Sequence, residues 1–185
     1  SGFRELDKIT AGLQKGELII IAGRPSMGKT AFALNIAEHV ALAHNNPVAI
    51  FSMEMSASSL AQRMISSLGR VNAHSVKTGK LEEKDWHRID GAIQQMRDAP
   101  IYIDDTPSLT PIEIRARARR IQREKGLKLI VIDYLQLMTV SGSKENRATE
   151  ISEISRNLKA LARELDIPII ALSQLNRSVE QRNDK

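Results

Sequence analysis

The sequence predicts an α/β fold in which helices flank a mostly parallel, doubly wound sheet. Three observations lead to this expectation. Short apolar runs rich in Ile and Val recur along the 185 residues. Segments of helical periodicity separate these runs, an alternation typical of parallel sheets. A loop containing glycine joins the first apolar run to the first long helical segment. The length suits one domain with a buried core, which we place at residues 1–185.

The strands of this sheet are expected at five apolar runs. Each run is continuous rather than alternating, which is typical of strands buried on both faces of a parallel sheet. The runs lie at residues 18–22, 48–52, 101–104, 129–134 and 167–173.

Five helical segments are expected between the strands. The first three cover residues 30–43, 56–68 with Ser56 as N-cap, and 82–96. The fourth opens at Thr110, where Pro111 and Glu113 complete a capping box. The fifth covers residues 146–165, and its apolar residues step by three or four along one face. They are Ile151, Ile154, Leu158, Leu161 and Leu165. The polar segment 139–148 before it is expected to be a mobile loop.

Composition excludes several classes of protein. Hydrophobic residues make up 42% and charged residues 26%, which rules out wholesale disorder. The absence of cysteine excludes disulfides and thiolate chemistry, and it fits a reducing compartment. Aromatic residues are only 3%, which argues against a recognition sheet of stacked rings. No apolar stretch is long enough for a transmembrane helix, and no signal peptide is recognisable. The net charge of +5 permits a polyanionic partner.

Residues 23–30, GRPSMGKT, carry the strongest functional signal because they match the phosphate-binding pattern G-x-x-x-x-G-K-[ST]. Glycines let successive backbone N–H groups face one anion, and the helix that follows adds its positive end. Lys29 is expected to reach the phosphates and the Thr30 hydroxyl to bind Mg²⁺. The residues expected to contact the nucleotide here are Ser26, Met27, Gly28, Lys29, Thr30 and Ala31.

Hydrolysis also needs a carboxylate beside the magnesium ion, and two acidic strand ends compete for that role. Asp133 ends the run 129–133, and Asp104 with Asp105 ends the run 101–104. Both lie at the carboxyl edge of the sheet, where ligands bind in open α/β folds. The longer and purer apolar run favours Asp133. A solvated strand end before Pro107 is the alternative explanation for Asp104 and Asp105.

Two further polar residues follow strands. Glu54, between Met53 and Met55, has two equally favoured interpretations. It is either the base that polarises the attacking water or a negative charge that stabilises the N-terminus of the next helix. Gln174 suits a sensor of the γ-phosphate, although the pattern alone favours an ordinary loop amide.

Four ordered blocks resemble the family of bacterial replicative DNA helicases of the DnaB type. They are GRPSMGKT at 23–30, FSMEM at 51–55, IDYLQLM at 132–138 and SQLNR at 173–177. The lead-in at residues 1–18 is similar to that of RecA-type ATPases. The resemblance therefore implies a RecA-like P-loop NTPase fold over the whole chain.

The resemblance also implies roles for individual residues. The hydrolytic glutamate corresponds to Glu54, acting with Lys29, and the magnesium-shell aspartate to Asp133. The γ-phosphate sensor corresponds to Gln174. An arginine that packs against the nucleotide corresponds to Arg63, for which an exposed helix arginine is the alternative.

The implied activity is an ATP- and Mg²⁺-dependent motor working at subunit interfaces of a homo-hexameric ring. Such a motor moves along single-stranded DNA from 5′ to 3′ and unwinds the replication fork in the bacterial cytoplasm, with primase and a helicase loader as partners. The family's trans-acting basic finger and main DNA loop are expected beyond Lys185, and its amino-terminal domain before this chain. A fragment without that finger is expected to bind ATP and hydrolyse it poorly.

Other functions remain open. A recombinase, or a repair or clock ring ATPase of the RecA class, would use the same residues. A non-motor ATP-binding loader would use some of them. A small-molecule kinase is a weaker alternative. Candidate DNA contacts are Ser141, Lys144, Arg147 and Arg177. The basic run 115–125 is more often a solvated face or a subunit contact than a DNA-binding surface.

Overall fold

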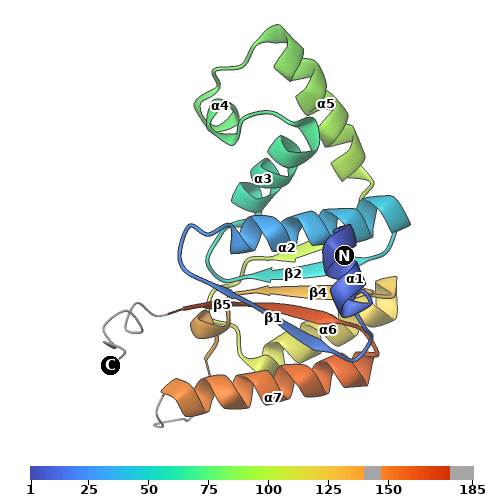
Figure 1. Ribbon diagram of the computed structural model, residues 1–185, viewed down its shortest axis with the longest axis vertical. Coiled ribbons are helices and arrows are strands. Elements are labelled where there is room, and N and C mark those ends of the chain that lie inside the picture. The colour runs from blue at the N-terminus through green and yellow to red at the C-terminus, as the bar shows by residue number, and fades with distance from the viewer. Residues whose placement is uncertain (140–146, 176–185) are drawn as a thin grey trace.

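Five strands form one parallel sheet in the order β1-β5-β4-β2-β3 in this computed structural model (Figure 1), which describes residues 1–139 and 147–175. Every strand pair in the sheet is parallel, as the sequence predicts. The strands are β1 (Leu18–Gly23), β2 (Val48–Ser52), β3 (Ile101–Asp104), β4 (Leu129–Asp133) and β5 (Ile169–Gln174). The five predicted runs match them to within a few residues.

Burial follows position in the sheet. All residues of the inner strands β2 and β4 are buried, which explains their continuous apolar sequences. The edge strands β1 and β3 are only partly buried, and Ile20 on β1 is 44% exposed. Continuous apolar sequence therefore identifies the strands, whereas burial depends on neighbours that the pattern does not reveal.

Helices cover both faces of the sheet (Figure 1). One face packs against α2 (Lys29–Glu38) and α3 (Ala57–Gly69), where Leu34, Ile36, Leu60 and Met64 are buried. The opposite face packs against α6 (Pro111–Lys125) and α7 (Arg147–Leu165). The sheet is thus the middle layer of three, as in doubly wound folds.

Local signals at the helix ends are confirmed. The Ser56 side chain accepts a hydrogen bond from the Ser59 backbone N–H and caps α3. Thr110 and Glu113 form the reciprocal capping box that opens α6. Along α7, Ile154, Leu158 and Leu161 of the predicted stripe are buried.

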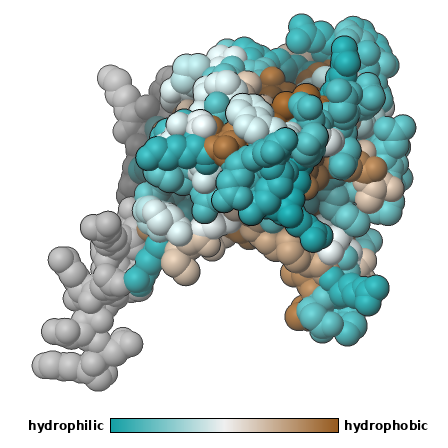
Figure 2. Space-filling view, turned by 90° about the horizontal axis from the view of Figure 1, so that it is seen from above, coloured by the Kyte–Doolittle hydropathy of each residue, from teal (hydrophilic) through white to brown (hydrophobic). Residues whose placement is uncertain are grey.

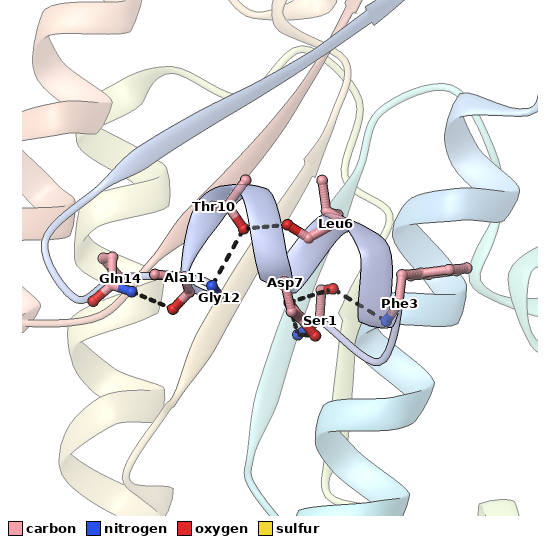
Figure 3. Close-up of polar contacts among 8 residues, drawn as sticks. All are labelled: Ser1, Phe3, Leu6, Asp7, Thr10, Ala11, Gly12 and Gln14. Carbon is pink, nitrogen blue, oxygen red and sulfur yellow. Dashed lines mark hydrogen bonds and ion pairs between the residues drawn. The ribbon is translucent and has the colours of Figure 1, made fainter.

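Several short elements were not predicted. They are α1 (Arg4–Thr10), α4 (Ala73–Thr78) and the 3₁₀-helix η2 (Leu135–Leu137), whereas the π-helix η1 (His39–Ala43) continues α2 within the helical segment predicted at residues 30–43. None is long enough to show an apolar period. Figure 3 shows the local hydrogen bonds that shape α1, among them those from the Ser1 hydroxyl to Asp7 and from the Thr10 hydroxyl to the Leu6 carbonyl.

The chain between β2 and β3 forms an arm made of α3, α4 and α5 (Glu83–Arg97). The arm is attached through the buried side of α3 and extends away from the sheet (Figure 1). Seen from above this arm, the surface is largely hydrophilic, with hydrophobic residues in small separate groups (Figure 2). Within residues 1–139 and 147–175, no helix combines the length and apolar character needed to cross a membrane. The segment 140–146, most of the loop predicted to be mobile, lies outside the described residues.

Candidate functional site

The phosphate-loop sequence forms a tight loop between the end of β1 and the start of α2. Gly28 caps α2 with φ of 83°, a conformation that favours glycine, and Ser26 also has a positive φ of 63°. The Lys29 ammonium donates a 2.9 Å hydrogen bond to the Arg24 carbonyl and so spans the loop. A Cβ on Gly23 would lie 3.2 Å from the Lys29 Cγ, so the first glycine leaves room for the lysine stem.

The side chains of Thr30 and Asp133 meet at the base of this loop. The Thr30 hydroxyl donates a 2.8 Å hydrogen bond to Asp133 Oδ2. Asp133 is 3% exposed, and its burial raises the pKa of the carboxyl above the usual range, with the Thr30 hydrogen bond acting in the opposite direction. The two predicted magnesium ligands therefore form one oxygen-rich corner between α2 and β4.

A pocket of about 250 Å³ opens in front of this corner. Glu54 enters it from the end of β2, Arg63 from α3 and Gln174 from the end of β5. The backbone N–H of Leu175 donates to the Gly23 carbonyl, which holds the end of β5 beside the loop. Of the residues predicted to act on a nucleotide, the pocket brings together Ser26, Gly28, Lys29, Thr30, Ala31, Glu54, Arg63 and Gln174.

Met27 and Asp133 are placed differently. The Met27 side chain is 72% exposed and does not line the pocket. Asp133 lies beneath the pocket and meets it through Thr30.

Asp104 and Asp105, the competing acidic residues, form hydrogen bonds outside the phosphate loop. Asp104 accepts hydrogen bonds from Arg117, at 2.6 Å, and from the Thr106 backbone N–H. The Asp105 carboxylate accepts a 2.8 Å hydrogen bond from the Ala57 backbone N–H at the start of α3. These contacts give Asp104 and Asp105 structural roles at the edge of the sheet, and Asp133 is the aspartate that contacts the phosphate loop.

Sequence reasoning did not single out three residues that lie in or beside the site. Met55 and Tyr134 line the pocket, and each directly follows a residue that was predicted. Gln136 holds the end of β5 through hydrogen bonds to Ser173 and Gln174. Its position within the block IDYLQLM is the only sequence signal that could have found it.

The donor set suits Mg²⁺ that arrives with a nucleotide. Across the described ranges 1–139 and 147–175, no group of three or more His, Cys, Asp or Glu side chains is placed to hold a metal ion by itself. Mg²⁺ commonly takes only one or two protein oxygens and completes its shell with phosphates and water. A hydroxyl and a carboxylate meeting at a phosphate loop fit that requirement.

Most of the predicted DNA-contacting residues are not among those that the structure describes. Ser141, Lys144 and Arg177 lie outside the described residues. Arg147 begins α7, and its guanidinium bonds to Glu150 and to the carbonyls of Gln136 and Met138.

The basic run on α6 is partly neutralised. Arg117 pairs with Asp104, while Arg115 and Arg119 both pair with Glu164 on α7. Three of the six basic residues of this run are therefore engaged in ion pairs within the fold.

The family model described as DnaB-like helicase C terminal domain matches residues 1–185. This chain belongs to that family. The recognition made from the four sequence blocks is thereby confirmed, and the RecA-like fold with it.

Individual members of the DnaB-like family are close in sequence and structure. The replicative DNA helicase DnaB of Geobacillus stearothermophilus is 60% identical over 186 residues, and the replicative DNA helicase DnaC of Bacillus subtilis is 56% identical over 186 residues. A solved structure described as an ATPase domain has a TM-score of 0.92 and 39% identity, covering 99% of this chain and 66% of that chain. A solved DnaB-like replicative helicase, described with its interactions with primase, has a TM-score of 0.93 and 39% identity over 100% of this chain and 45% of that chain. The alignments to both curated relatives cover 100% of this chain and 41% of each relative.

Proposed function

We propose that this chain is the nucleotide-hydrolysing motor of a replicative DNA helicase. In the longer protein, it hydrolyses ATP at subunit interfaces of a homo-hexameric ring that moves along single-stranded DNA in the 5′ to 3′ direction and unwinds the replication fork. The setting is the bacterial cytoplasm, with primase and a helicase loader as partners. Membership of the DnaB-like family supports this proposal, as does the solved relative described with primase.

The observation that carries the proposal is the hydrogen bond between Thr30 and Asp133 beside a pocket that also contains Glu54 and Gln174. A phosphate loop alone binds nucleotide, whereas a motor also needs an acid near the metal, a group that orients water and a group that responds to the γ-phosphate. Residues suited to all these tasks come from β4, β2 and β5, three adjacent strands at the centre of one sheet.

Each residue has a chemical task in this proposal. The loop N–H groups and the Lys29 ammonium bind the phosphates, and Arg63 packs against the rest of the nucleotide. Glu54 accepts a proton from the attacking water and orients it toward the γ-phosphate. Thr30 and Asp133 would hold Mg²⁺, which would neutralise charge on the phosphates. Gln174 donates a hydrogen bond to the γ-phosphate and is released when that phosphate leaves.

Hydrolysis by this site is expected to depend on a neighbouring subunit. Arginine fingers supplied in trans accelerate phosphate-loop enzymes by about 10³–10⁵-fold. The chain by itself is therefore expected to bind ATP and to turn it over slowly, while the ring of the longer protein turns it over rapidly on DNA.

The test uses the longer protein that carries this chain, assayed for ATP hydrolysis with and without single-stranded DNA and for unwinding of a forked duplex. Glu54→Gln should reduce DNA-stimulated hydrolysis by about 10²–10⁴-fold and abolish unwinding, while the affinity for ATP stays within about threefold. Glu124→Gln removes an exposed carboxylate on α6, remote from the pocket, and serves as the matched control.

Two outcomes would replace the helicase proposal. Filament formation on single strands without unwinding would identify a recombinase-like ATPase. ATP binding without DNA-stimulated turnover in the wild-type ring would identify a non-motor, loader-like protein.

A further inference from the structure

Gln136 lies between two buried anchors. It occupies the middle of η2, which follows the strand that ends at Asp133. Leu135 and Met138 on either side of it are 2% and 0% exposed, and the Met138 backbone N–H donates to the Leu135 carbonyl at 3.1 Å. The backbone of this turn is therefore fixed in the core, and the partly buried Gln136 side chain extends from a fixed point.

The Gln136 amide makes a three-point contact with the end of β5. Its Nε2 donates to the Ser173 hydroxyl at 2.9 Å and to the Gln174 carbonyl at 3.1 Å. Its Oε1 accepts from the Gln174 backbone N–H at 3.1 Å. Both polar ends of one side chain thus bracket the backbone of the residue proposed to sense the γ-phosphate. Such paired contacts fix orientation as well as distance.

The same turn is held from its other side by α7. The Arg147 guanidinium, at the first residue of α7, donates to the carbonyls of Gln136 and Met138 and pairs with Glu150 one turn along the helix. Contacts from Arg147 to η2 and from Gln136 to β5 therefore form one chain of hydrogen bonds from the start of α7 to Gln174.

We propose that Gln136 and Arg147 act as a pair of positioning residues that couple the state of Gln174 to the start of α7. A shift of Gln174 changes the Gln136 contacts, and Arg147 passes the change to α7. The pair acts through Gln174 and does not touch the nucleotide. This inference rests on the proposed ATPase function and adds the route by which the pocket communicates with the helix beyond η2.

A second consequence concerns Arg147. Its guanidinium is engaged with two carbonyls and a carboxylate, so it acts in coupling rather than as a phosphate contact for DNA. Removing a phosphate contact lowers the salt dependence of DNA binding, with a slope change near one per contact. Removing a positioning arginine leaves that slope unchanged.

The experiment uses the longer protein as an assembled ring. Variants Gln136→Ala, Arg147→Ala and the double variant are compared for KM of ATP, basal kcat and kcat with single-stranded DNA. Each single variant should lower the DNA-stimulated kcat about tenfold while KM stays within about threefold, and the double variant should be no worse than either single one, because the residues act in series. Multiplying effects, or equal losses with and without DNA, would overturn the coupling role.

Gln136→Glu and Arg156→Ala serve as companion variants. The glutamate keeps the acceptor for the Gln174 N–H but loses the amide donors, so it should retain only part of the DNA stimulation. Full wild-type stimulation in this variant would contradict the three-point contact. Arg156 is an exposed arginine further along α7, and its removal should leave the DNA-stimulated kcat unchanged. The salt slope of DNA binding should be the same for Arg147→Ala and wild type; a loss near one unit would assign Arg147 to DNA instead.

Hydrogen exchange separates this inference from the proposed function. A non-hydrolysable ATP analogue should alter amide exchange over the first turns of α7 in the wild-type protein and not in Gln136→Ala. That measurement decides the coupling even if the ring shows no DNA-stimulated hydrolysis, a result that would remove the helicase proposal alone. An analogue-induced change of the same size in both proteins would overturn the inference.

Discussion

The Thr30 hydroxyl donates its hydrogen bond to Asp133 across 103 residues of sequence and joins the start of α2 to the end of β4. Because Asp133 is almost fully buried, this bond gives a hydrogen-bond partner to a carboxylate that is largely shielded from water. The contact stabilises the fold and, in the proposed function, also prepares the Mg²⁺ site, and these two effects can be measured separately.

Thr30→Ala is expected to affect the chain with and without nucleotide. It leaves a buried carboxylate without its hydroxyl partner, which should cost about 1–3 kcal/mol of unfolding free energy in the absence of nucleotide. Mg²⁺-dependent ATP binding should also weaken strongly. Urea unfolding and titration with a fluorescent ATP analogue measure the two effects. Thr30→Ser keeps the hydroxyl and should retain both properties; a loss equal to that of Thr30→Ala would disprove the role of the hydroxyl.

Substitutions at the two acidic strand ends, Asp104 and Asp133, are expected to have different effects. Asp104→Asn should lower stability by about 1–2 kcal/mol, because it breaks a half-buried ion pair with Arg117, and should leave ATP affinity unchanged. Asp133→Asn should reduce Mg²⁺-dependent ATP binding. Calorimetry of ATP binding with Mg²⁺ and with EDTA distinguishes them. Weaker Mg²⁺–ATP binding in Asp104→Asn would show that the assignment from the hydrogen bonds is wrong.

Gly23 is expected to be needed for the path of Lys29. In Gly23→Ala the new methyl group lies 3.2 Å from Lys29 Cγ and 3.3 Å from Cδ, so the lysine stem must move by a few tenths of an ångström. ATP affinity should fall by about three- to tenfold, with a stability change below about 1 kcal/mol.

Gly91 in α5 provides the matched control, since a Cβ there meets no atom within 4 Å. Gly91→Ala should raise stability by roughly 0.5–1 kcal/mol without changing ATP affinity. Equal nucleotide affinities for the two alanine variants would exclude the steric explanation.

Glu38 is expected to make stability depend on pH near neutrality. It is the last residue of α2, where its Oε2 accepts a hydrogen bond from the Ser67 hydroxyl on α3 and its Oε1 has no hydrogen-bond partner in the described part of the chain. Burial raises the pKa of this carboxyl from 4.5 to about 7, which the Ser67 bond only partly opposes. A raised pKa means that the folded state binds the proton more tightly than the unfolded state. The stability it contributes is therefore full below pH 4.5 and is lost as the pH rises through 7.

Glu38→Gln should remove this loss. At pH 8 the variant should exceed the wild-type protein by roughly 1–2 kcal/mol, a value reduced for partial access of water. The difference should shrink toward pH 5. Urea unfolding at several pH values checks this, with exposed Glu124→Gln as control. A pH-independent difference would contradict the raised pKa.

The sequence predicted the sheet because strands such as Val48–Ser52 and Leu129–Asp133 are apolar on both faces, which few other structures require. It also predicted helix starts at Ser56 and Thr110, since capping depends on residues only three positions apart. Helix α4 has an Asn72 N-cap and a Gly79 C-cap, but its six residues are too few to show an apolar stripe, and the three-residue turn η2 has no side-chain cap.

The site was predicted where chemistry demands a particular residue at a particular spacing, as at Lys29 and Thr30. The pattern left Asp104 and Asp133 in competition, because both end apolar strands. Only the strand order, which places β4 centrally and β3 at the edge, brings Asp133 to Thr30 and leaves Asp104 to Arg117. Gln136 escaped notice because its partners on β5 lie 37 and 38 residues away in sequence, and no local pattern records them.

The position of β1 at the margin of the sheet has a mechanical consequence. Within the described residues it pairs with β5 alone, so its other side presents N–H and C=O groups to any strand laid beside it. β1 ends at Gly23, where the phosphate loop begins. A force applied along a strand paired with β1 would therefore act directly on the phosphate loop, with no flexible linker between them.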